Sequence, residues 1–409
     1  MNNGSGRPWN SGIVSAIIWT TWLALITGVA LIPFFKADPK FAYSSVTDMS
    51  HSAGLTFLRD IHHWSSALII ILGVTYVVTG LYRGVYEKPG HKVWIMTILL
   101  FVLGMLMQLT GHLLPMDQHA VRTTVIETGI ATNAPVIGEM QAKLLRAGDL
   151  VGPNTFYLWL KAHIAFLAVV TLALSILVPL AGRKEGVSFK RVPWILGAFG
   201  LVVLAALTLH APLGKPAAAD DFNGLATRPE WYVLPLHSLL DIAQSLNRQM
   251  AFLGTMVLPG LALLFILALP WLDRRARLGK ALGVVGGLAL IGLFLMTVGN
   301  VAPPVGDQIV VETGGGQVGN VKLDPKLVAQ GKTLFADQGC VGCHTIAGKG
   351  GKAGPNLTNE ASRHADIDWQ IRHLKDPAKV TPGSTMPDYA DLKASELQAL
   401  AQYLVSLKE

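Results

Sequence analysis

Hydrophobic positions along this chain gather into seven long runs separated by polar loops, and this pattern predicts membrane-spanning helices. An α-helix of about 20 predominantly apolar residues crosses the hydrocarbon core of a bilayer. We therefore expect an all-α protein built on a polytopic bundle of seven transmembrane helices. The runs are 13–34, 56–81, 93–114, 156–180, 192–210, 250–270 and 281–299.

The loops between these runs predict an orientation. Basic residues concentrate in the short loops 82–92, 181–191 and 271–280, whereas the alternating loops are longer and mixed in charge. Because short cytoplasmic loops carry an excess of Lys and Arg, these three are predicted to be cytoplasmic. The N-terminus is then cytoplasmic, the C-terminus is outside, and a bacterial inner membrane is the expected location. The long loop 115–155 is predicted to have its own short helices, one of them at Glu139–Arg146.

Composition supports a membrane protein and narrows its partners. The sequence is 51% hydrophobic and 14% charged, which is far from the average of soluble domains. Its net charge of +7 arises in the short loops, with no basic stripe interleaved with aromatic residues. We therefore expect a membrane environment and no nucleic-acid partner. The two cysteines, Cys340 and Cys343, lie three positions apart and give no disulfide framework.

The pattern changes after the seventh run. Residues 301–325 are rich in proline and glycine and show no helical period, which is typical of a linker. Residues 326–409 are soluble in character. Helical patterns at Pro325–Gln338 and Ala394–Lys408 open and close this part, so we expect a small α-helical domain there.

The motif Cys340-Val341-Gly342-Cys343-His344 indicates a covalently attached haem c. Its spacing lets two thioethers hold the haem while the adjacent histidine ligates iron. A thioredoxin-type CxxC is the rival interpretation, but it lacks the histidine. Met386 is the only methionine after residue 300 and is the expected second ligand, with His364 or His373 as alternatives. A thioether ligand raises the reduction potential. Haem attachment outside the cytoplasm agrees with the predicted topology.

Two histidines inside the apolar runs, His62 and His163, predict a second haem. Ionisable residues within membrane helices are costly and usually functional. Two neutral imidazoles that face each other across a helical bundle can hold a haem iron from both sides. The alternative is a histidine that is hydrogen-bonded within the bundle, and for a single histidine that alternative is the stronger one.

Residues 13–300 resemble the cytochrome b of quinol:cytochrome c oxidoreductases, the bc-type complexes, including the form divided into b and subunit IV. The C-terminal domain resembles a small class I cytochrome c. Four segments in the right order carry the first resemblance. They are Arg59-Asp60-Ile61-His62, Gly111–Gln118, His163 followed by Arg183–Gly186, and Pro229-Glu230-Trp231-Tyr232.

This resemblance implies a domain division and a quinol site. Residues 1–185 correspond to the four-helix haem-binding part and 186–300 to the three-helix, subunit IV-like part, followed by the linker 301–325 and the cytochrome c domain 326–409. Arg59 is expected beside haem b. The quinol site is expected at Pro229, Glu230, Trp231 and Tyr232. Quinol oxidation releases two protons, so Glu230 is the candidate base; the alternative is a solvated loop carboxylate.

The sequence departs from the family at the position of a second b haem. The family places further histidines 14 and 15 residues beyond those that correspond to His62 and His163. Here these positions are Tyr76 and Val178, and the expected propionate-binding arginine is Thr79. We therefore predict one non-covalent, bis-histidine haem b and one covalent haem c. His63 is about 100° around the helix from His62 and cannot share its iron, which leaves a structural polar contact or a lining of the quinol site as its alternatives. His210 and His237 are left unassigned.

The predicted function is membrane electron transfer between the quinone pool and a periplasmic acceptor, as a subunit of a bc-type quinol:cytochrome c oxidoreductase-like complex. The expected partners are quinol or quinone, a Rieske iron–sulfur protein or another redox subunit, and a periplasmic electron carrier. A homodimer is left open. Two alternatives are a subunit that reduces quinone with electrons from a periplasmic dehydrogenase, and a docking anchor for cytochrome c without quinone chemistry. The loss of the second haem puts the family's bifurcating Q cycle in doubt.

Overall fold

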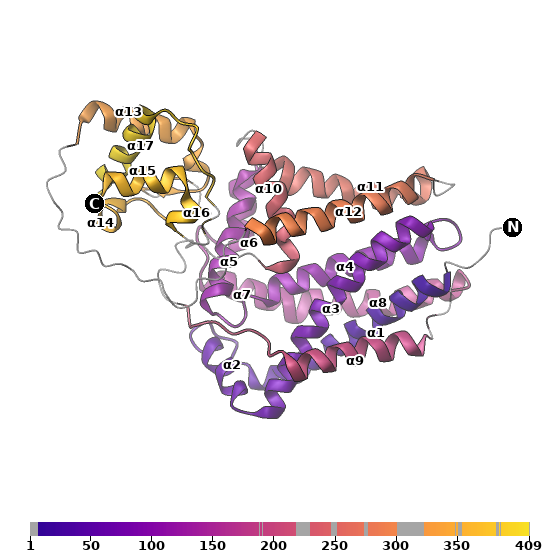
Figure 1. The fold of residues 1–409 in the computed structure, drawn as a ribbon. Coiled ribbons are helices and arrows are strands. Elements are labelled where there is room, and N and C mark those ends of the chain that lie inside the picture. The colour runs from indigo at the N-terminus through magenta and orange to yellow at the C-terminus, as the bar shows by residue number, and fades with distance from the viewer. Residues whose placement is uncertain are drawn as a thin grey trace. The chain divides into compact units, whose positions relative to one another are not determined.

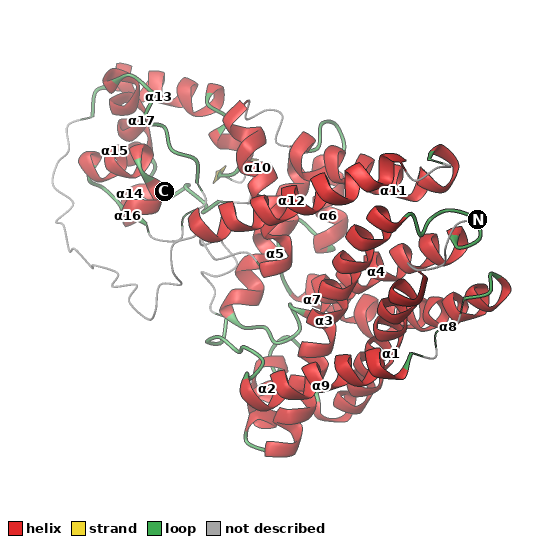
Figure 2. Ribbon diagram, turned by 45° about the vertical axis from the view of Figure 1, so that its right-hand side comes forward, coloured by secondary structure: helices red, strands yellow, loops and turns green. Residues whose placement is uncertain are grey.

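The computed structural model describes residues 7–187, 189, 191–217, 230–246, 252–273, 277–300, 323–347, 349–350, 354–381, 384 and 386–408. Helices account for nearly all of the regular structure in these residues (Figure 2). The chain divides into two compact units. Unit 1 comprises Met1–Ala120, Pro153–Pro216 and Gly260–Gly292, and unit 2 comprises Val121–Gly152, Ala217–Pro259 and Leu293–Glu409.

Long apolar helices make up unit 1. The helix that carries His163 is continuous from 153 to 184 and contains one π-helical segment, η3. The helices of this region, with the short elements between them, are α1 (Arg7–Leu31), η1 (Ile32–Phe34), α2 (Ala42–Ser50), α3 (Ala53–Arg83), α4 (His91–Gly111), α7 (Pro153–Lys161), η3 (Ala162–Leu167), α8 (Ala168–Lys184), α9 (Val192–Thr208), α11 (Leu258–Leu272) and α12 (Arg277–Asn300).

The structure confirms a polytopic helix bundle. Each of the seven apolar runs forms a helix, and six helices in the described residues are long and apolar enough to cross a membrane. The remaining one, α9, has 17 residues, which is the lower end of the length that spans a bilayer. The seventh crossing therefore stays a prediction.

Four helices close into a ring. Helix α1 packs against α3, α3 against α4, α4 against α8, and α8 against α1, and the four run alongside one another in Figure 1. Helix α9 packs against α1 and α3. A ring of this kind places side chains from facing helices in a shared interior, where bundles build cofactor sites.

The buried hydrophobic core of unit 1 is centred on Tyr76, Trp94 and Val178, a group we call the aromatic layer. These side chains are 1%, 0% and 0% exposed, respectively. Trp94 stacks obliquely on Tyr76 at a ring-centroid distance of 5.4 Å, and its Nε1 donates to the carbonyl of Ile266 at 3.1 Å. At about 1.5 Å per helical residue, this layer lies about 21 Å along α3 from His62.

Unit 2 contains helices in stretches that the sequence presents as loops. Short helices were expected in loop 115–155, and the one predicted at Glu139–Arg146 is confirmed as α6. Helix α5 lies in the same loop, but its position was not predicted, and α10 was not predicted at all. Both are short and mix polar with apolar residues, so no long run marks them. The elements are α5 (Gln118–Ile130, which begins in unit 1), η2 (Ala131–Asn133), α6 (Gly138–Arg146), η5 (Trp231–Val233), α10 (Leu234–Leu246) and the π-helix η7 (Leu253–Val257).

The C-terminal domain is helical, as predicted. Its first and last helices pack against each other, and their bounds agree with the predicted ones to within two residues. Helix α13 begins after Asp324, whose carboxylate accepts from the backbone N–H of Lys326 at 2.8 Å and caps the helix. The elements are α13 (Pro325–Asp337), η8 (Cys340–Gly342), the antiparallel pair β1 (Thr345–Ile346) and β2 (Lys349–Gly350), α14 (Glu360–Arg363), α15 (Ile367–Lys375), α16 (Pro377–Val380) and α17 (Ala394–Ser406).

Candidate haem and quinol sites

The two histidines predicted to hold haem b face each other inside the ring of four helices. Their ring centroids are 6.3 Å apart, and the ring planes are inclined at 81°. His62 is carried by α3. His163 lies in the π-helical segment η3. Single π-helical turns inside α-helices occur often at functional sites. We call these two residues the histidine layer.

Backbone carbonyls orient both imidazoles in the same way. Nδ1 of His62 lies 2.9 Å from the carbonyl oxygen of Ala24, and Nδ1 of His163 lies 3.0 Å from that of Met107. A carbonyl only accepts hydrogen bonds, so Nδ1 carries the proton in each ring. Nε2 is then the nitrogen with a free lone pair, which is the form of histidine that binds a metal.

Each histidine also meets a Thr-Gly pair on the neighbouring helix. Thr27 Oγ1 lies 3.3 Å from Nδ1 of His62, and Thr110 Oγ1 lies 3.2 Å from Nδ1 of His163. A Cβ atom added to Gly28 would lie 2.9 Å from His62 Cε1, and one added to Gly111 would lie 2.7 Å from His163 Cε1. The two glycines therefore leave the space that the rings occupy.

The histidine layer fits a six-coordinate iron. Imidazole nitrogen bonds a transition metal at about 2 Å, so two such ligands on opposite sides of one ion have ring centroids about 6 Å apart. The observed separation of 6.3 Å agrees with this requirement. The donor set, two neutral imidazoles inside a helical bundle, is suited to haem. These observations support a haem b between His62 and His163.

Arg59, the third residue predicted beside haem b, contacts the segment that follows α9. Its Nη2 donates to the carbonyls of Ala211 and Pro212 at 2.6 and 2.8 Å. The next residue, Asp60, is fully buried and accepts from the backbone N–H of Ala211 at 2.8 Å. Its other oxygen lies 2.8 Å from Nδ1 of His210. This pair of charged residues therefore fixes the 210–212 segment beside α3.

The residues at the positions of a second b haem do not fit one. Tyr76 and Val178 belong to the aromatic layer, and Trp94 fills the space between the helices beside them. Valine has no atom that can ligate iron. The Thr79 hydroxyl donates within its own helix, to the carbonyl of Thr75 at 2.6 Å. This end of the ring is occupied by side chains.

The haem c motif is arranged around an oriented histidine. Cys340 begins the single-turn helix η8 and Cys343 follows it, and the two form no disulfide. Nδ1 of His344 lies 2.9 Å from the carbonyl of Pro355, so this ring also keeps Nε2 for a metal. Burial lowers the pKa of His344, which keeps the imidazole neutral.

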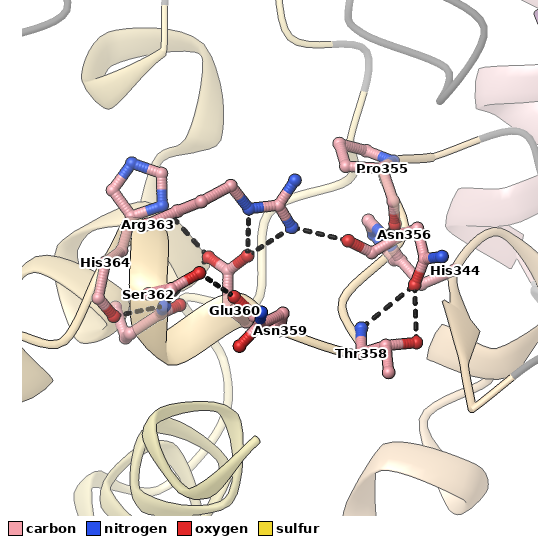
Figure 3. Close-up of polar contacts among 10 residues, drawn as sticks. His344, Pro355, Asn356, Thr358, Asn359, Glu360, Ser362, Arg363 and His364 are labelled. Atoms are coloured by element: carbon pink, nitrogen blue, oxygen red, sulfur yellow. Dashed lines mark hydrogen bonds and ion pairs between the residues drawn. The ribbon is translucent and has the colours of Figure 1, made fainter. Parts of the chain in front are cut away.

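A network around Glu360 holds the loop that orients His344 (Figure 3). Glu360 is 5% exposed and accepts from Arg363 Nη2 at 2.6 Å. The same guanidinium group donates to the carbonyl of Asn356, next to Pro355, at 2.5 Å. Burial alone would raise the pKa of Glu360, but His364, Arg363 and Gln370 together lower it. The carboxylate is therefore ionised and paired.

The three candidates for the second haem c ligand have different surroundings. Met386 is half-buried against the core of the C-terminal domain. His364 and His373 both stack with Trp369, at centroid distances of 3.6 and 4.9 Å. Nδ1 of His364 is also bonded to Glu360 at 3.0 Å. The engagement of both histidines with Trp369 favours Met386.

The predicted quinol site is partly described. Pro229 lies outside the described residues. Glu230 is half-buried and precedes η5. Trp231 and Tyr232 follow it with ring planes inclined at 84°, and Tyr232 is 9% exposed. His237, one turn into α10, is 6% exposed, with Nδ1 3.2 Å from the carbonyl of Val233.

These geometries define a class of protein: a helical membrane protein with a bis-histidine centre and a separate CxxCH centre. The comparisons agree. The family model for cytochrome b/b6/petB matches residues 6–186, and that for cytochrome c matches 328–408. The chain belongs to the cytochrome b/b6 family and carries a C-terminal cytochrome c domain.

The chain is similar to cytochrome b proteins and to one solved respiratory complex. The chain is 31% identical over 173 residues to the menaquinol:cytochrome c reductase cytochrome b subunit of Geobacillus thermodenitrificans, covering 42% of this chain and 77% of that protein. It is 28% identical over 177 residues to cytochrome b6 of Porphyra purpurea, covering 43% and 82%. A solved structure, "Hyperthermophilic respiratory Complex III", shares the fold, with a TM-score of 0.58, 21% identity, and 73% and 84% coverage.

Sequence reasoning missed the residues that shape these sites from neighbouring elements. The Thr-Gly pairs 27–28 and 110–111 lie in helices α1 and α4 and are positioned only by helix packing. A glycine inside an apolar helix does signal a close approach, and that signal was present at both pairs. Glu127, in α5, is the other omission, because nothing in the sequence brings it near Glu230.

Proposed function

We propose that this chain transfers electrons between quinol or quinone in the membrane and a redox partner outside it. One haem b is held by His62 and His163. One haem c is attached to Cys340 and Cys343 and ligated by His344 and Met386. The observation that carries the proposal is the histidine layer, whose ring separation of 6.3 Å and matched carbonyl contacts suit a bis-histidine iron.

The quinol is proposed to bind beside Pro229, Glu230, Trp231 and Tyr232. Glu230 accepts a proton from the quinol hydroxyl, and the electrons pass to one-electron acceptors. The haem that His62 and His163 would hold would take the electrons one at a time. An iron–sulfur protein of Rieske type or another redox subunit would link this haem to haem c. The bound haems supply reversible one-electron chemistry, while the chain orients their ligands and holds the proton acceptor. The role of the relatives in quinol:cytochrome c reductases supports this assignment.

Haem stoichiometry is part of the proposal. The close packing of the aromatic layer supports a single haem b per chain. Without a second b haem, the chain lacks the usual route for electrons across the membrane, so we propose a linear transfer rather than the family's bifurcating cycle. The positive loops support an orientation with the cytochrome c domain outside a bacterial inner membrane.

Anaerobic addition of a short-chain menaquinol to the purified complex tests the function. We expect the absorption of reduced haem b to appear, and pyridine haemochrome analysis of the isolated chain to give a b:c ratio near one. Haem b that neither accepts electrons from quinol nor donates them to quinone would support the docking-anchor alternative. Faster reduction of quinone than oxidation of quinol, driven from the c haem, would support the reverse direction. A b:c ratio near two would restore a second b haem.

A further inference from the structure

A second buried carboxyl group lies beside the predicted quinol site. Glu127 is on α5, and both of its carboxylate oxygens are buried. Tyr232, in η5, is also buried, and its hydroxyl has no hydrogen-bond partner among the described residues. Nε2 of His237, on α10, is likewise buried and has no hydrogen-bond partner among the described residues. A buried polar group without a partner costs about 1–3 kcal/mol, so two of them in one region indicate a place where a ligand binds.

The charges of these groups act on one another. Burial raises the pKa of Glu127 well above its ordinary value, and the negative charge of Glu230 adds to this effect. The pKa of Tyr232 is raised by burial and by the charges of both glutamates. Two neighbouring carboxyl groups do not ionise together easily, so the more buried one keeps its proton. Both effects favour the protonated form of Glu127, which can donate a hydrogen bond.

We propose, on the basis of the proposed function, that Glu127 is a second carboxyl group of the quinol site and binds an oxygen of the head group by donating a hydrogen bond. Tyr232 completes the binding group. Two carboxyl groups whose surroundings separate their protonation states commonly divide the acid and base roles of a site. The ligand is a quinol or quinone head group, whose ring oxygens both accept and donate hydrogen bonds.

The two glutamates then have different tasks. When quinol is oxidised to quinone, two O–H bonds break. One proton passes to Glu230, where a new O–H bond forms, the second passes to water, and the two electrons go one at a time to the one-electron acceptors of the proposed function. Glu127 keeps its own proton and holds the ring oxygen in place. Removing Glu230 should therefore slow turnover, whereas changing Glu127 should alter binding.

The pH dependence has a defined sign. Below its raised pKa, Glu127 is protonated and can donate; above it, Glu127 is an anion beside a second anion, and binding weakens. Among the described residues, Glu230 and Tyr232 are titratable groups that interact electrostatically with Glu127. Arg146 of α6 contacts the adjacent residue of α5, its Nε donating to Thr128 Oγ1 at 2.9 Å, and its own charge partner is Glu139.

The test is quinol oxidation by the purified complex at a series of pH values, with a short-chain menaquinol as the probe. In the wild type, KM should rise roughly tenfold per pH unit above the pKa of Glu127. Glu127→Gln should remove this rise, because an amide donates at every pH. Glu230→Gln should lower kcat at all pH values with little change in KM. Glu139→Gln removes an exposed carboxylate of α6 and should match the wild type.

A second measurement does not depend on turnover. Infrared difference spectra of the resting protein between acid and alkaline pH should contain the C=O band of a protonated carboxyl group, absent in Glu127→Gln. If that variant does not retain haem b, Glu127→Asp should shift the band instead. A wild type that neither oxidises nor binds the quinol overturns the proposed function. An active wild type whose pH profile and infrared band are unchanged in Glu127→Gln overturns this inference alone.

Discussion

The histidine layer and the aromatic layer are built by the same four helices and differ in what those helices place inside the ring. At one level, His62 and His163 are 6.3 Å apart and glycines on α1 and α4 leave room for their rings. At the other, Tyr76, Trp94 and Val178 are at most 1% exposed and belong to one buried hydrophobic cluster. The same four helices therefore place very different side chains in the interior at the two levels.

The difference shows that side-chain volume, as well as ligand identity, decides where such a bundle holds haem. Protein interiors are close-packed. A bundle interior that is already filled by bulky side chains therefore leaves no space for a large cofactor. In the aromatic layer, both ligand positions have lost histidine and Trp94 occupies the interior. Regaining haem there would require restored ligands and a smaller residue than tryptophan.

Removing one histidine gives the largest expected effect. His163→Leu should abolish haem b, because a single remaining imidazole leaves one face of the iron without its ligand. Haem c should be retained, since its ligands lie in a separate domain. Reduced-minus-oxidised spectra of the purified chain measure both. His63→Leu is the matched control on the adjacent position of α3, and retention of haem b in His163→Leu would contradict the assignment.

Replacing the proposed methionine ligand of haem c should give the next largest effect. This substitution should change the reduction potential of haem c without removing the haem. Met386→His should keep the covalent haem and lower its reduction potential, because imidazole replaces a thioether. The shift falls within the range of about 0.8 V that axial ligands set. A redox titration measures it, and the haem b potential is the internal control. An unchanged haem c potential would exclude Met386 as a ligand.

The sequence was sufficient for the elements that are long and periodic and for the motifs that are local. The apolar runs, the CxxCH motif and the histidine pair could be read directly, because each depends on spacing within one segment. The contacts of Ala24, Thr27 and Gly28 with His62 depend on how α1 packs on α3, which no local pattern specifies. The helix α5 was missed because it is short and partly polar, and the position of Glu127 was missed with it.

Glycine-to-alanine substitutions beside each layer show how the histidine layer and the aromatic layer respond to one added methyl group. Gly111→Ala places a Cβ 2.7 Å from His163 Cε1 and should reduce haem b occupancy, because ligands need to be held to within about 0.5 Å. Gly80→Ala places a Cβ against the Trp94 ring and should lower the free energy of unfolding by about 1–3 kcal/mol through overpacking. Haem b spectra of Gly80→Ala should match the wild type. Thermal unfolding and haem content, measured together, separate the two effects, and a spectral change in Gly80→Ala would link the layers.

The smallest expected effect comes from the hydroxyl of Tyr76, and it tests whether that residue binds iron. The hydroxyl is buried with the Thr97 hydroxyl near it, but it makes no hydrogen bond of good geometry among the described residues, so Tyr76→Phe should leave haem content unchanged. The free energy of unfolding should stay level or rise by about 1 kcal/mol, because an unsatisfied polar group is removed. Tyr86→Phe is the control: that hydroxyl donates to Asp273 at 2.6 Å, and its loss should destabilise the protein by about 1.5–3 kcal/mol. A tyrosine that ligated iron would give the opposite order, with Tyr76→Phe losing haem and the larger share of stability. The two thermal shifts and one haem assay therefore decide whether the aromatic layer is packing alone.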